Sequence, residues 1–376
     1  MAINKTKNLV ISAINLFEGG PLSILEDCLI ELKNEKYINY DIKVLVHKID
    51  LVKHHKSCNF SFIEFPLSRK SYFFRLYYEF FKFKQLSMNW DVNLWFSLHD
   101  ITPNVRAQKR VVYCHNSTPF YKRTVKDFFS YPNLFLSSFF YKYFYKINIK
   151  KNDFVIVQPY WLKIEFVKLF GVKADKIIVA SPILDSVNTL PTLCTKKKND
   201  VTTFFYPCIS RPFKNIEVIA QACRILSRNK ISNFKLILTI DGTENRYSRE
   251  IFEKFGDVKE IHFIGKQTRE SVNKIYRDSD ILLFPSTLET WGLPITEFKP
   301  FGKPMLVSNL RYAKETVGIY SDVDFLNPKN PNDWADKMHK IILKLPVTYM
   351  GNNSIEIPQP KANSWSSVFK ILLLED

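Results

Sequence analysis

The stretch that decides the fold of this 376-residue chain is Phe284-Pro285-Ser286-Thr287-Leu288-Glu289-Thr290-Trp291-Gly292-Leu293-Pro294-Ile295-Thr296-Glu297. A mostly apolar run, residues 280–284, leads into it and predicts a short buried strand. Pro294 suits the first position of a helix, where its missing N–H costs no hydrogen bond. The stretch therefore predicts a turn from a strand to a helix, with Glu289 in the loop and Glu297 in the first helical turn. In an open parallel sheet, ligands bind at this edge.

Two carboxylates around such a turn suit a phosphorylated sugar. The backbone N–H groups of Trp291, Gly292 and Leu293 can donate to phosphate or sugar oxygens. Taken singly, each acid also has an ordinary interpretation. Glu289 can be a solvated loop residue, and Glu297 an acid that the helix dipole favours by about 0.3–1 kcal/mol.

The frame Pro-Ser-x-x-Glu-x-x-Gly-Leu-Pro-x-x-Glu, which ends at Glu297, resembles the signature of family 4 retaining glycosyltransferases. The resemblance implies an α/β chain of the GT-B class, in which two Rossmann-like domains have parallel sheets facing across a cleft. It also implies that Glu289 holds hydroxyls of the donor sugar and Glu297 hydroxyls of the nucleotide ribose. The residues between them that would complete the donor loop are Thr290, Trp291, Gly292 and Leu293.

The length of the chain agrees with two domains of ordinary size. We predict an N-terminal acceptor-binding domain at 1–185, a hinge at 186–200, a C-terminal nucleotide-sugar domain at 201–350 and a tail at 351–376. The hinge is rich in Thr, Pro and Asn and contains Lys196-Lys197-Lys198. By the resemblance, the tail contains a helix that crosses back to pack on the N-terminal domain.

The chain is strongly basic, with a net charge of +17, and 15% of its residues are aromatic. This combination indicates an anionic partner, namely a membrane face, a diphosphate or a nucleic acid, or else only a lysine-rich surface. The sequence has no run of 18 apolar residues and no signal-peptide pattern, so we expect a cytosolic protein. Its six cysteines have no metal-binding or redox spacing, and we interpret them as reduced.

Two stretches, residues 72–86 and 134–146, combine aromatic and basic residues. In the first, Arg75, Glu79 and Lys82 form one polar stripe, and aromatic residues cover the rest of the helix. Such a helix buries most of its circumference. Two interpretations remain open. The stretches can be core helices of the first domain, or a cationic aromatic face on an anionic bilayer at the inner side of the cell membrane, near a lipid-linked acceptor.

The N-terminal half begins with a predicted strand at 9–14, the pair Gly19-Gly20 and a helix at 21–32, the order of a phosphate-binding Rossmann half. The resemblance implies that Gly19 and Gly20 face the donor diphosphate and the acceptor. It also implies that His115, at the end of a strand at 111–114, reaches the donor sugar or its phosphate. His99-Asp100 is a candidate for orienting the acceptor. The ordinary interpretation of each histidine is a structural residue.

Basic residues that could neutralise a departing diphosphate follow the strand at 202–206. Arg211 and Lys214 resemble the Arg and Lys that do this in the family, although the family spacing is longer than Arg211-Pro212-Phe213-Lys214. A guanidinium and an ammonium both suit phosphate oxygens. The alternative is an exposed basic turn. Gly265-Lys266, after a predicted strand at 261–264, is our candidate for contact with the nucleotide base.

Two Asp-x-Asp triplets, Asp278-Ser279-Asp280 and Asp322-Val323-Asp324, raise the alternative of a divalent metal. Both are expected to precede strands, at the amino edge of the sheet and away from the ligand edge. We therefore expect a metal-independent enzyme without a cofactor, in which the nucleotide-sugar is a substrate.

These observations together predict a retaining hexosyltransferase that moves a sugar from a nucleotide-sugar to a saccharide acceptor, most simply a lipid-linked one, in capsule or O-antigen synthesis. One alternative is another GT-B enzyme, a sugar-nucleotide epimerase or an inverting transferase. A second is a basic protein that binds nucleic acid. Against the second, the aromatic residues have the spacing of a helix core and no RNA-binding module pattern is present, so we expect no nucleic-acid partner.

Overall fold

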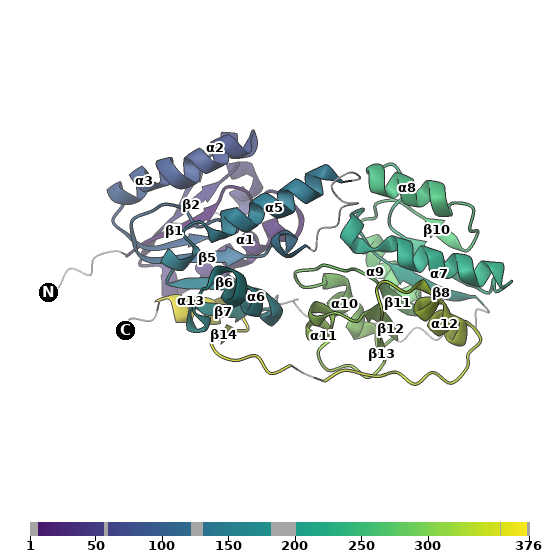
Figure 1. Cartoon of the computed structure of the whole chain (residues 1–376). Helices are drawn as coiled ribbons and strands as arrows, with labels where there is room; N and C mark the ends of the chain where they lie inside the picture. The colour runs from purple at the N-terminus through teal and green to yellow at the C-terminus, as the bar shows by residue number, and fades with distance from the viewer. Residues whose placement is uncertain (1–6, 56–58, 122–130, 182–200, 354, 374–376) are drawn as a thin grey trace. The chain divides into compact units, whose positions relative to one another are not determined.

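The structure is a computed structural model that describes residues 7–55, 59–121, 131–181, 201–353 and 355–373 (Figure 1). The chain forms two compact units. Unit 1 is Met1–Ile183 together with Ile357–Asp376, and unit 2 is Leu184–Glu356. The predicted hinge, residues 186–200, lies outside the described residues.

Unit 1 is built on a parallel sheet of eight strands in the order β14-β7-β6-β5-β4-β1-β2-β3. Its strands are β1 (Lys7–Ala13), β2 (Tyr40–Val46), β3 (Phe60–Glu64), β4 (Val92–Ser97), β5 (Ala107–Cys114), β6 (Phe154–Val157), β7 (Ile177–Ala180) and β14 (Lys361–Ala362). Its helices are α1 (Gly19–Leu32), α2 (Tyr72–Tyr77), α3 (Phe83–Asn89), α5 (Pro132–Lys146), α6 (Tyr160–Phe170) and α13 (Trp365–Leu373). A π-helical turn, η5 (Tyr78–Lys82), joins α2 to α3.

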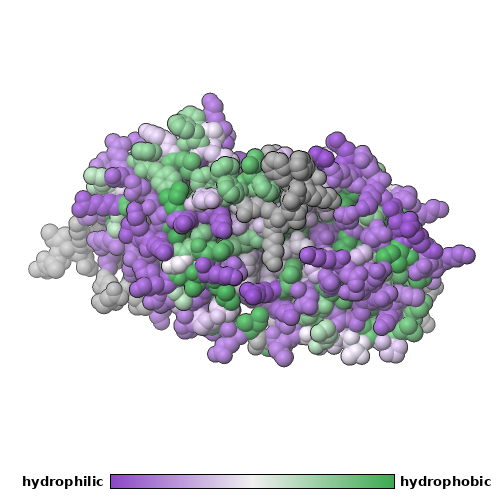
Figure 2. All heavy atoms as spheres, viewed as in Figure 1, coloured by the Kyte–Doolittle hydropathy of each residue, from purple (hydrophilic) through white to green (hydrophobic). Residues whose placement is uncertain are grey.

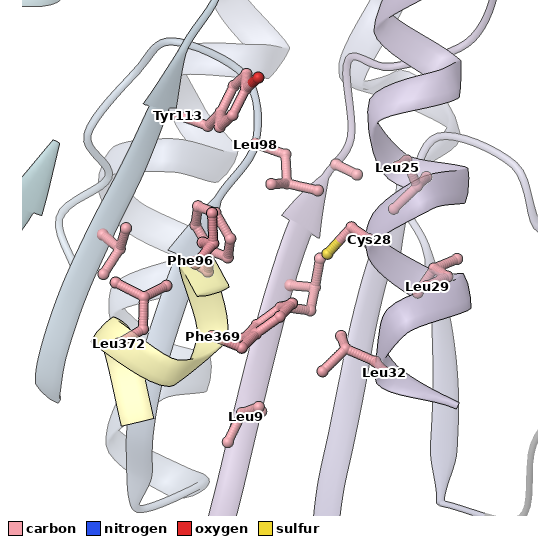
Figure 3. Packing of buried hydrophobic residues seen from close by; sticks show 14 of the residues in the cluster. Leu9, Leu25, Cys28, Leu29, Leu32, Phe96, Leu98, Tyr113, Phe369 and Leu372 are labelled. Carbon is pink, nitrogen blue, oxygen red and sulfur yellow. The ribbon is translucent and has the colours of Figure 1, made fainter. Parts of the chain in front are cut away.

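Helices cover both faces of this sheet, because successive side chains of each strand point to opposite faces. Leu9 and Ile11 of β1 lie in the core under α1 and α13, whereas Val10 lies in the core that includes Phe83 of α3. Figure 3 shows the first of these cores, with side chains of α1 and α13 meeting over the strands. Strands buried on both faces read as continuous apolar runs, as β6 and β7 do.

The helix expected to cross back near the end of the chain is α13. Its buried residues are Val368, Phe369 and Leu372, and the Phe369 ring lies 6.2 Å from that of Phe96 in β4. Just before it, β14 pairs in parallel with β7 and extends the sheet. The last part of the chain therefore belongs to unit 1, although unit 2 separates it in sequence from the rest.

Unit 2 is built on a parallel sheet of six strands in the order β10-β9-β8-β11-β12-β13. Its strands are β8 (Thr202–Tyr206), β9 (Phe234–Leu238), β10 (Ile261–Phe263), β11 (Ile281–Phe284), β12 (Met305–Ser308) and β13 (Val323–Leu326). Its helices are α7 (Ile216–Arg228), α8 (Arg246–Phe255), α9 (Arg269–Asp278), α10 (Leu293–Phe298), α11 (Arg311–Val317) and α12 (Pro331–Ile342). Two parallel-sheet α/β units agree with the fold class predicted from the sequence.

Each sheet has one point at which the order of its strands reverses. In unit 2, the chain proceeds outward from β8 in one direction and from β11 in the other. In unit 1, the reversal lies between β1 and β4. In open α/β sheets, ligands bind at the carboxyl edge of such a reversal point, where the loops that follow the two strands diverge. The topology thus assigns one candidate binding edge to each unit.

The aromatic stretch at residues 72–86, for which the sequence left a core helix and a cationic aromatic face open, is not one continuous α-helix. It is broken into α2, η5 and α3, and its polar stripe faces inward: Arg75 is 3% and Glu79 0% exposed. Several aromatic residues face solvent instead, among them Phe73, Tyr77 and Phe81. The sequence pattern shows a polar stripe but not whether it faces solvent or the interior, and here Arg75 and Glu79 face the interior. Within the described residues, no helix is both long and apolar enough to cross a bilayer.

Candidate functional site

The carboxyl edge of unit 2 brings Lys214 and Glu289 together. Lys214 ends a 3-10 turn, η9 (Pro212–Lys214), which follows β8, and Glu289 lies in the loop after β11. These strands are neighbours at the reversal point, so the two loops leave the sheet side by side. The Lys214 Nζ lies 2.6 Å from Glu289 Oε1, and only 11% and 13% of the two side chains are exposed. An ammonium and a carboxylate so shielded from water stabilise each other's charge.

Backbone contacts fix both loops behind this pair. Tyr206 Oη donates to the carbonyl of Lys214 at 3.0 Å. Asn215, with a left-handed φ of 54°, donates from Nδ2 to the carbonyls of Pro285 at 3.1 Å and Pro328 at 2.8 Å. Asn tolerates this backbone region better than most residues. The Thr287 N–H donates to the Phe213 carbonyl at 2.7 Å. The Lys214–Glu289 pair is therefore held by a rigid frame rather than by a freely moving loop.

The turn from β11 into α10 contains Gly292 with a φ of 94°, a conformation that requires glycine. Thr316 Oγ1 donates to the carbonyl of Trp291, and Trp291 Nε1 donates to Thr296 Oγ1 at 2.9 Å. Thr290 and Trp291 are half-buried, and Leu293, 37% exposed, is the first residue of α10. The residues predicted to form the donor loop thus lie in one turn beside Glu289.

Glu297 lies in the second turn of α10, because the helix begins at Leu293 and Pro294 is its second residue. The prediction of a first-turn acid was wrong by this offset. Its Oε2 accepts a hydrogen bond from Tyr276 Oη at 3.0 Å. Burial, with the nearby charge of Glu297, raises the pKa of Tyr276 well above its usual range, so the phenol stays a donor. Glu297 is half-buried and keeps further acceptor capacity.

The remaining predicted residues of this edge lie farther along it. Arg211 is exposed, at the start of the loop that leads to Lys214. Gly265 (φ 67°) and Lys266 follow β10, which is separated from β11 by β9 and β8. Lys266 is exposed. All of these residues lie after carboxyl ends of parallel strands, where the Lys214 side chain pairs with Glu289 and its N–H donates to the Arg211 carbonyl at 2.9 Å.

The two Asp-x-Asp triplets have structural partners. Asp280 Oδ2 accepts from the N–H of Thr203 at 2.9 Å, at the amino end of β8. Asp324, which lies within β13 rather than before it, pairs with Lys337 and accepts from the Met350 N–H. Three other potential ligand groups, those of Glu26, His54 and His55, lie within 4.8 Å of one another in unit 1.

The carboxyl edge of unit 1 places His115 next to Asp100. Asp100 Oδ1 accepts the backbone N–H of His115 at 2.9 Å, that of Asn116 at 3.1 Å and the hydroxyl of Tyr145 at 2.7 Å. Asp100 is buried and has a φ of 72°, an unusual conformation for a residue other than glycine. Such strain persists where the surroundings dictate it. Asp100 therefore positions the loop that carries His115.

Gly19 and Gly20 lie at the same edge, after β1. They form the first two residues of α1 rather than a turn before it, which corrects the predicted helix start at residue 21. Both are exposed, Gly19 has a φ of 60°, and a side chain built at either would meet no atom within 4 Å. The open space and the missing side chains allow a ligand to approach this backbone closely.

A buried polar network lies between these glycines and Asp100. His99 is fully buried, with its Nε2 3.0 Å from Ser12 Oγ and its Nδ1 3.3 Å from Glu79 Oε1. Burial lowers the pKa of His99 well below its usual range and raises that of Glu79 to about 8. Arg75 donates to the His99 carbonyl at 2.9 Å. A neutral histidine beside a protonated glutamate satisfies these contacts, with His99 Nε2 donating to Ser12 and Nδ1 accepting.

Sequence reasoning overlooked several residues that hold the site. Asn215, Tyr276 and Tyr145 each connect segments that are 20 or more positions apart, which no local pattern reveals. Glu79 did carry a signal, since it is the single acid between residues 72 and 89. An acid among so many aromatic residues is as consistent with a buried network as with a solvated stripe.

Comparison with known proteins identifies the class of unit 2. Residues 195–353 match the family model described as Glycosyl transferases group 1. The match covers most of unit 2, which is therefore similar to the domain that this model describes. The chain is 23% identical to the O-antigen chain mannosyltransferase RfbU of Salmonella typhimurium over 246 residues. These aligned residues cover 65% of this chain and 63% of that relative.

Solved glycosyltransferase structures share the fold of the whole chain. A glycosyltransferase from Rickettsia africae aligns with a TM-score of 0.61 at 17% identity, over 90% of this chain and 89% of that one. Anabaena Alr3699/HepE in complex with UDP-glucose aligns with a TM-score of 0.55 at 15% identity, over 90% of both chains. The fold prediction, two parallel-sheet α/β domains of the GT-B class, is confirmed.

Proposed function

We propose that this protein is a family 4 retaining glycosyltransferase that moves a hexosyl unit from a nucleoside diphosphate sugar to a saccharide acceptor in O-antigen or capsule assembly. The observation that carries the proposal is the ion pair of Lys214 and Glu289 at the reversal point of unit 2, 2.6 Å apart. The match of this unit to group 1 glycosyltransferases supports it. The description of RfbU as an O-antigen chain mannosyltransferase supports the polysaccharide setting.

The Lys214–Glu289 pair suits a nucleotide-sugar donor because each side chain can form a hydrogen bond with the donor in place of the bond within the pair. The Lys214 ammonium can move its hydrogen bonds to phosphate oxygens, and the Glu289 carboxylate can accept sugar hydroxyls instead. In the absence of donor, each neutralises the other and keeps its position. Donor binding would then replace the Lys214–Glu289 ion pair by contacts of each side chain with the donor, so neither charge is left buried without a partner.

Lys214 would also stabilise the negative charge that develops on the diphosphate, assisted by Arg211, so that no divalent metal is required for this step. Charge stabilisation of this kind contributes about 2.7–4 kcal/mol per donor. In the retaining reaction, the bond from the anomeric carbon to the phosphate oxygen breaks, and the acceptor oxygen bonds to the same face. The proton of the acceptor passes to the departing phosphate oxygen. His115 and the Gly19-Gly20 backbone would face the reacting sugar and the acceptor.

The test is transfer with purified full-length protein and its Glu289→Gln and Lys214→Gln variants. Both keep a hydrogen-bonding group in place, which protects the fold. Donors are mannose and glucose linked to UDP or GDP, because mannose and UDP-glucose occur in the names of the relatives. We expect kcat to fall by roughly a hundredfold or more in each variant.

The matched control is Lys254→Gln, which breaks the surface ion pair of Lys254 with Glu217 in the same unit. Such exposed pairs contribute about 0–1 kcal/mol, so activity should stay near that of the wild type. Full activity of the Glu289 and Lys214 variants would overturn the site. An inverted product, seen by NMR of the anomeric proton, would overturn retention alone, and loss of activity with a chelator would overturn the metal-free step.

A further inference from the structure

Unit 1 exposes aromatic and aliphatic side chains on one continuous surface. On α2 and η5 these are Phe73, Tyr77 and Phe81, and on α5 they are Leu136, Phe140 and Tyr143, each 46–75% exposed. We call these six residues the aromatic face. Figure 2 shows hydrophobic residues at the surface where α2 and α5 lie. Scattered exposed apolar residues are ordinary, but a contiguous group of large ones marks an interaction site.

The spacing of these residues makes the face continuous. Phe73, Tyr77 and Phe81 recur every four positions, and the π-helical turn brings the Tyr77 and Phe81 rings into a stack with 6.1 Å between centroids. The α5 residues recur at three and four positions, which aligns them along one side of that helix. The two helices touch, since Arg75 Nη1 donates to Tyr141 Oη at 3.5 Å.

The exposed charges on the helical segments that carry the face have one sign. Between residues 72 and 89 the single acid is Glu79, which is fully buried, and residues 132–146 contain no acid. The basic residues of these helices are Arg75, which is buried, and Lys82, Lys84, Lys142 and Lys146, which are half-buried or exposed. Large aromatic side chains together with lysines and no exposed acid match a surface of anionic lipid, in which rings enter the interface and ammonium groups meet phosphates.

Buried contacts determine that this side of the helices faces outward. Arg75 and Glu79 point toward His99, and the N–H of Asn104 donates to the Glu79 carbonyl at 2.9 Å. With the polar stripe turned inward, Phe73 and Phe81 can only face solvent. The orientation of the helices is therefore fixed by the fold, not by the aromatic residues themselves.

One of these helices, α5, also reaches the carboxyl edge of unit 1, where His115 lies. Tyr145, near the end of α5, is buried and donates to Asp100, which holds the backbone of His115. One helix therefore has Tyr143 exposed on the aromatic face and Tyr145 bonded to the loop that carries His115. A lipid-anchored acceptor could keep its chain in the bilayer while its saccharide reaches this edge.

The geometry points to an anionic phospholipid bilayer as the partner of the aromatic face, which would thereby present the edge at His115 to a membrane-anchored acceptor. The part of this inference that concerns the acceptor depends on the proposed function, whereas bilayer binding does not.

The experiment is sedimentation of the full-length protein with vesicles of phosphatidylcholine alone or mixed with phosphatidylglycerol, at low and high salt. The variant is the double substitution Phe73→Ser/Phe81→Ser. Its matched control is Ile319→Ser in unit 2, because Ile319 is 74% and Phe73 75% exposed. We expect binding to the mixed vesicles that weakens at high salt, and a loss of about tenfold or more in the double variant only.

Absence of binding to the mixed vesicles, or equal loss in Ile319→Ser, would overturn the inference. So would a wild-type dimer that becomes monomeric in Phe73→Ser/Phe81→Ser without any change in vesicle binding, because the occupant would then be a second copy. Donor binding, followed as the shift in melting temperature with UDP and GDP sugars, should be unchanged in the double variant. That measurement separates failure of this inference from failure of the proposed transferase.

Discussion

Replacing Glu79 with Gln should make unit 1 more stable at neutral pH and leave it unchanged in mild acid. Glu79 is fully buried in η5, with Oε1 3.3 Å from His99 Nδ1. Burial raises its pKa to about 8, and the positive charge of Arg75 opposes this shift without cancelling it. A Gln amide has nearly the same shape as the protonated acid and can donate to the same nitrogen.

The magnitude follows from proton linkage. The folded-state pKa of Glu79 is about 8, and the ordinary value is 4.5. Between these values the folded state binds one proton more than the unfolded state, so the free energy of unfolding falls as pH rises, by about 1.4 kcal/mol per unit. From pH 5 to pH 7 the free energy of unfolding of the wild type should therefore fall by about 2–3 kcal/mol relative to that of Glu79→Gln. Above about pH 8 the difference should level off.

The wild type must be compared with Glu79→Gln because His99 changes the pH dependence of stability in the opposite direction to Glu79. Its pKa is lowered by burial, so the unfolded state binds more protons at low pH and stability falls as pH drops below the ordinary value of 6.5. This contribution is common to wild type and variant and cancels in the difference. Urea unfolding with pulse proteolysis, read from peptides of unit 1, measures that difference. A difference that stays constant between pH 5 and pH 7 would refute a raised pKa for Glu79.

Two further predictions concern the backbone of the candidate site. Asp100→Ala should destabilise unit 1 by about 3 kcal/mol, because three donors lose one acceptor and alanine disfavours the φ of 72°; urea unfolding tests this. Asp100→Asn keeps an oxygen and tolerates this backbone, so a loss as large as that of alanine would contradict the positioning role. Gly292→Ala should cost about 1–2 kcal/mol from its φ of 94°, since the added methyl meets Phe284 only at 3.4 Å. It should also weaken donor protection in thermal shift, and unchanged stability would show that this conformation is not strained.

The sequence predicted the second unit well because its signals are local. The strand before Glu289, the glycine in the turn and the proline at the start of α10 occur within 14 residues. The alternation of strands and helices predicts a parallel sheet, and therefore that Lys214 and Glu289 lie at the same edge of it. In the structure, Lys214 Nζ lies 2.6 Å from Glu289 Oε1. The offset of Glu297 by one residue, which moves it from the first turn into the second, arose because a proline is accepted at either the first or the second helical position.

Features that depend on packing could not be predicted in the same way. The strand β3 lies at one edge of its sheet, is only partly buried and lacks a continuous apolar run, and β14 has two residues. Whether the Arg75 and Glu79 stripe faced water or His99 depended on a partner that lies 20 residues farther along the chain. The positioning role of Asp100 depended on Tyr145, which belongs to another helix.

The placement of α13 has a consequence for synthesis of the chain. Phe369 and Leu372 fill the core under α1, yet they are translated only after all of unit 2. While unit 2 is being translated, the sheet of unit 1 lacks α13, so one of its faces is incompletely covered. Nascent unit 1 should therefore bind chaperones until α13 has been translated, and a stop codon placed just before α13 should send the truncated chain to proteolysis.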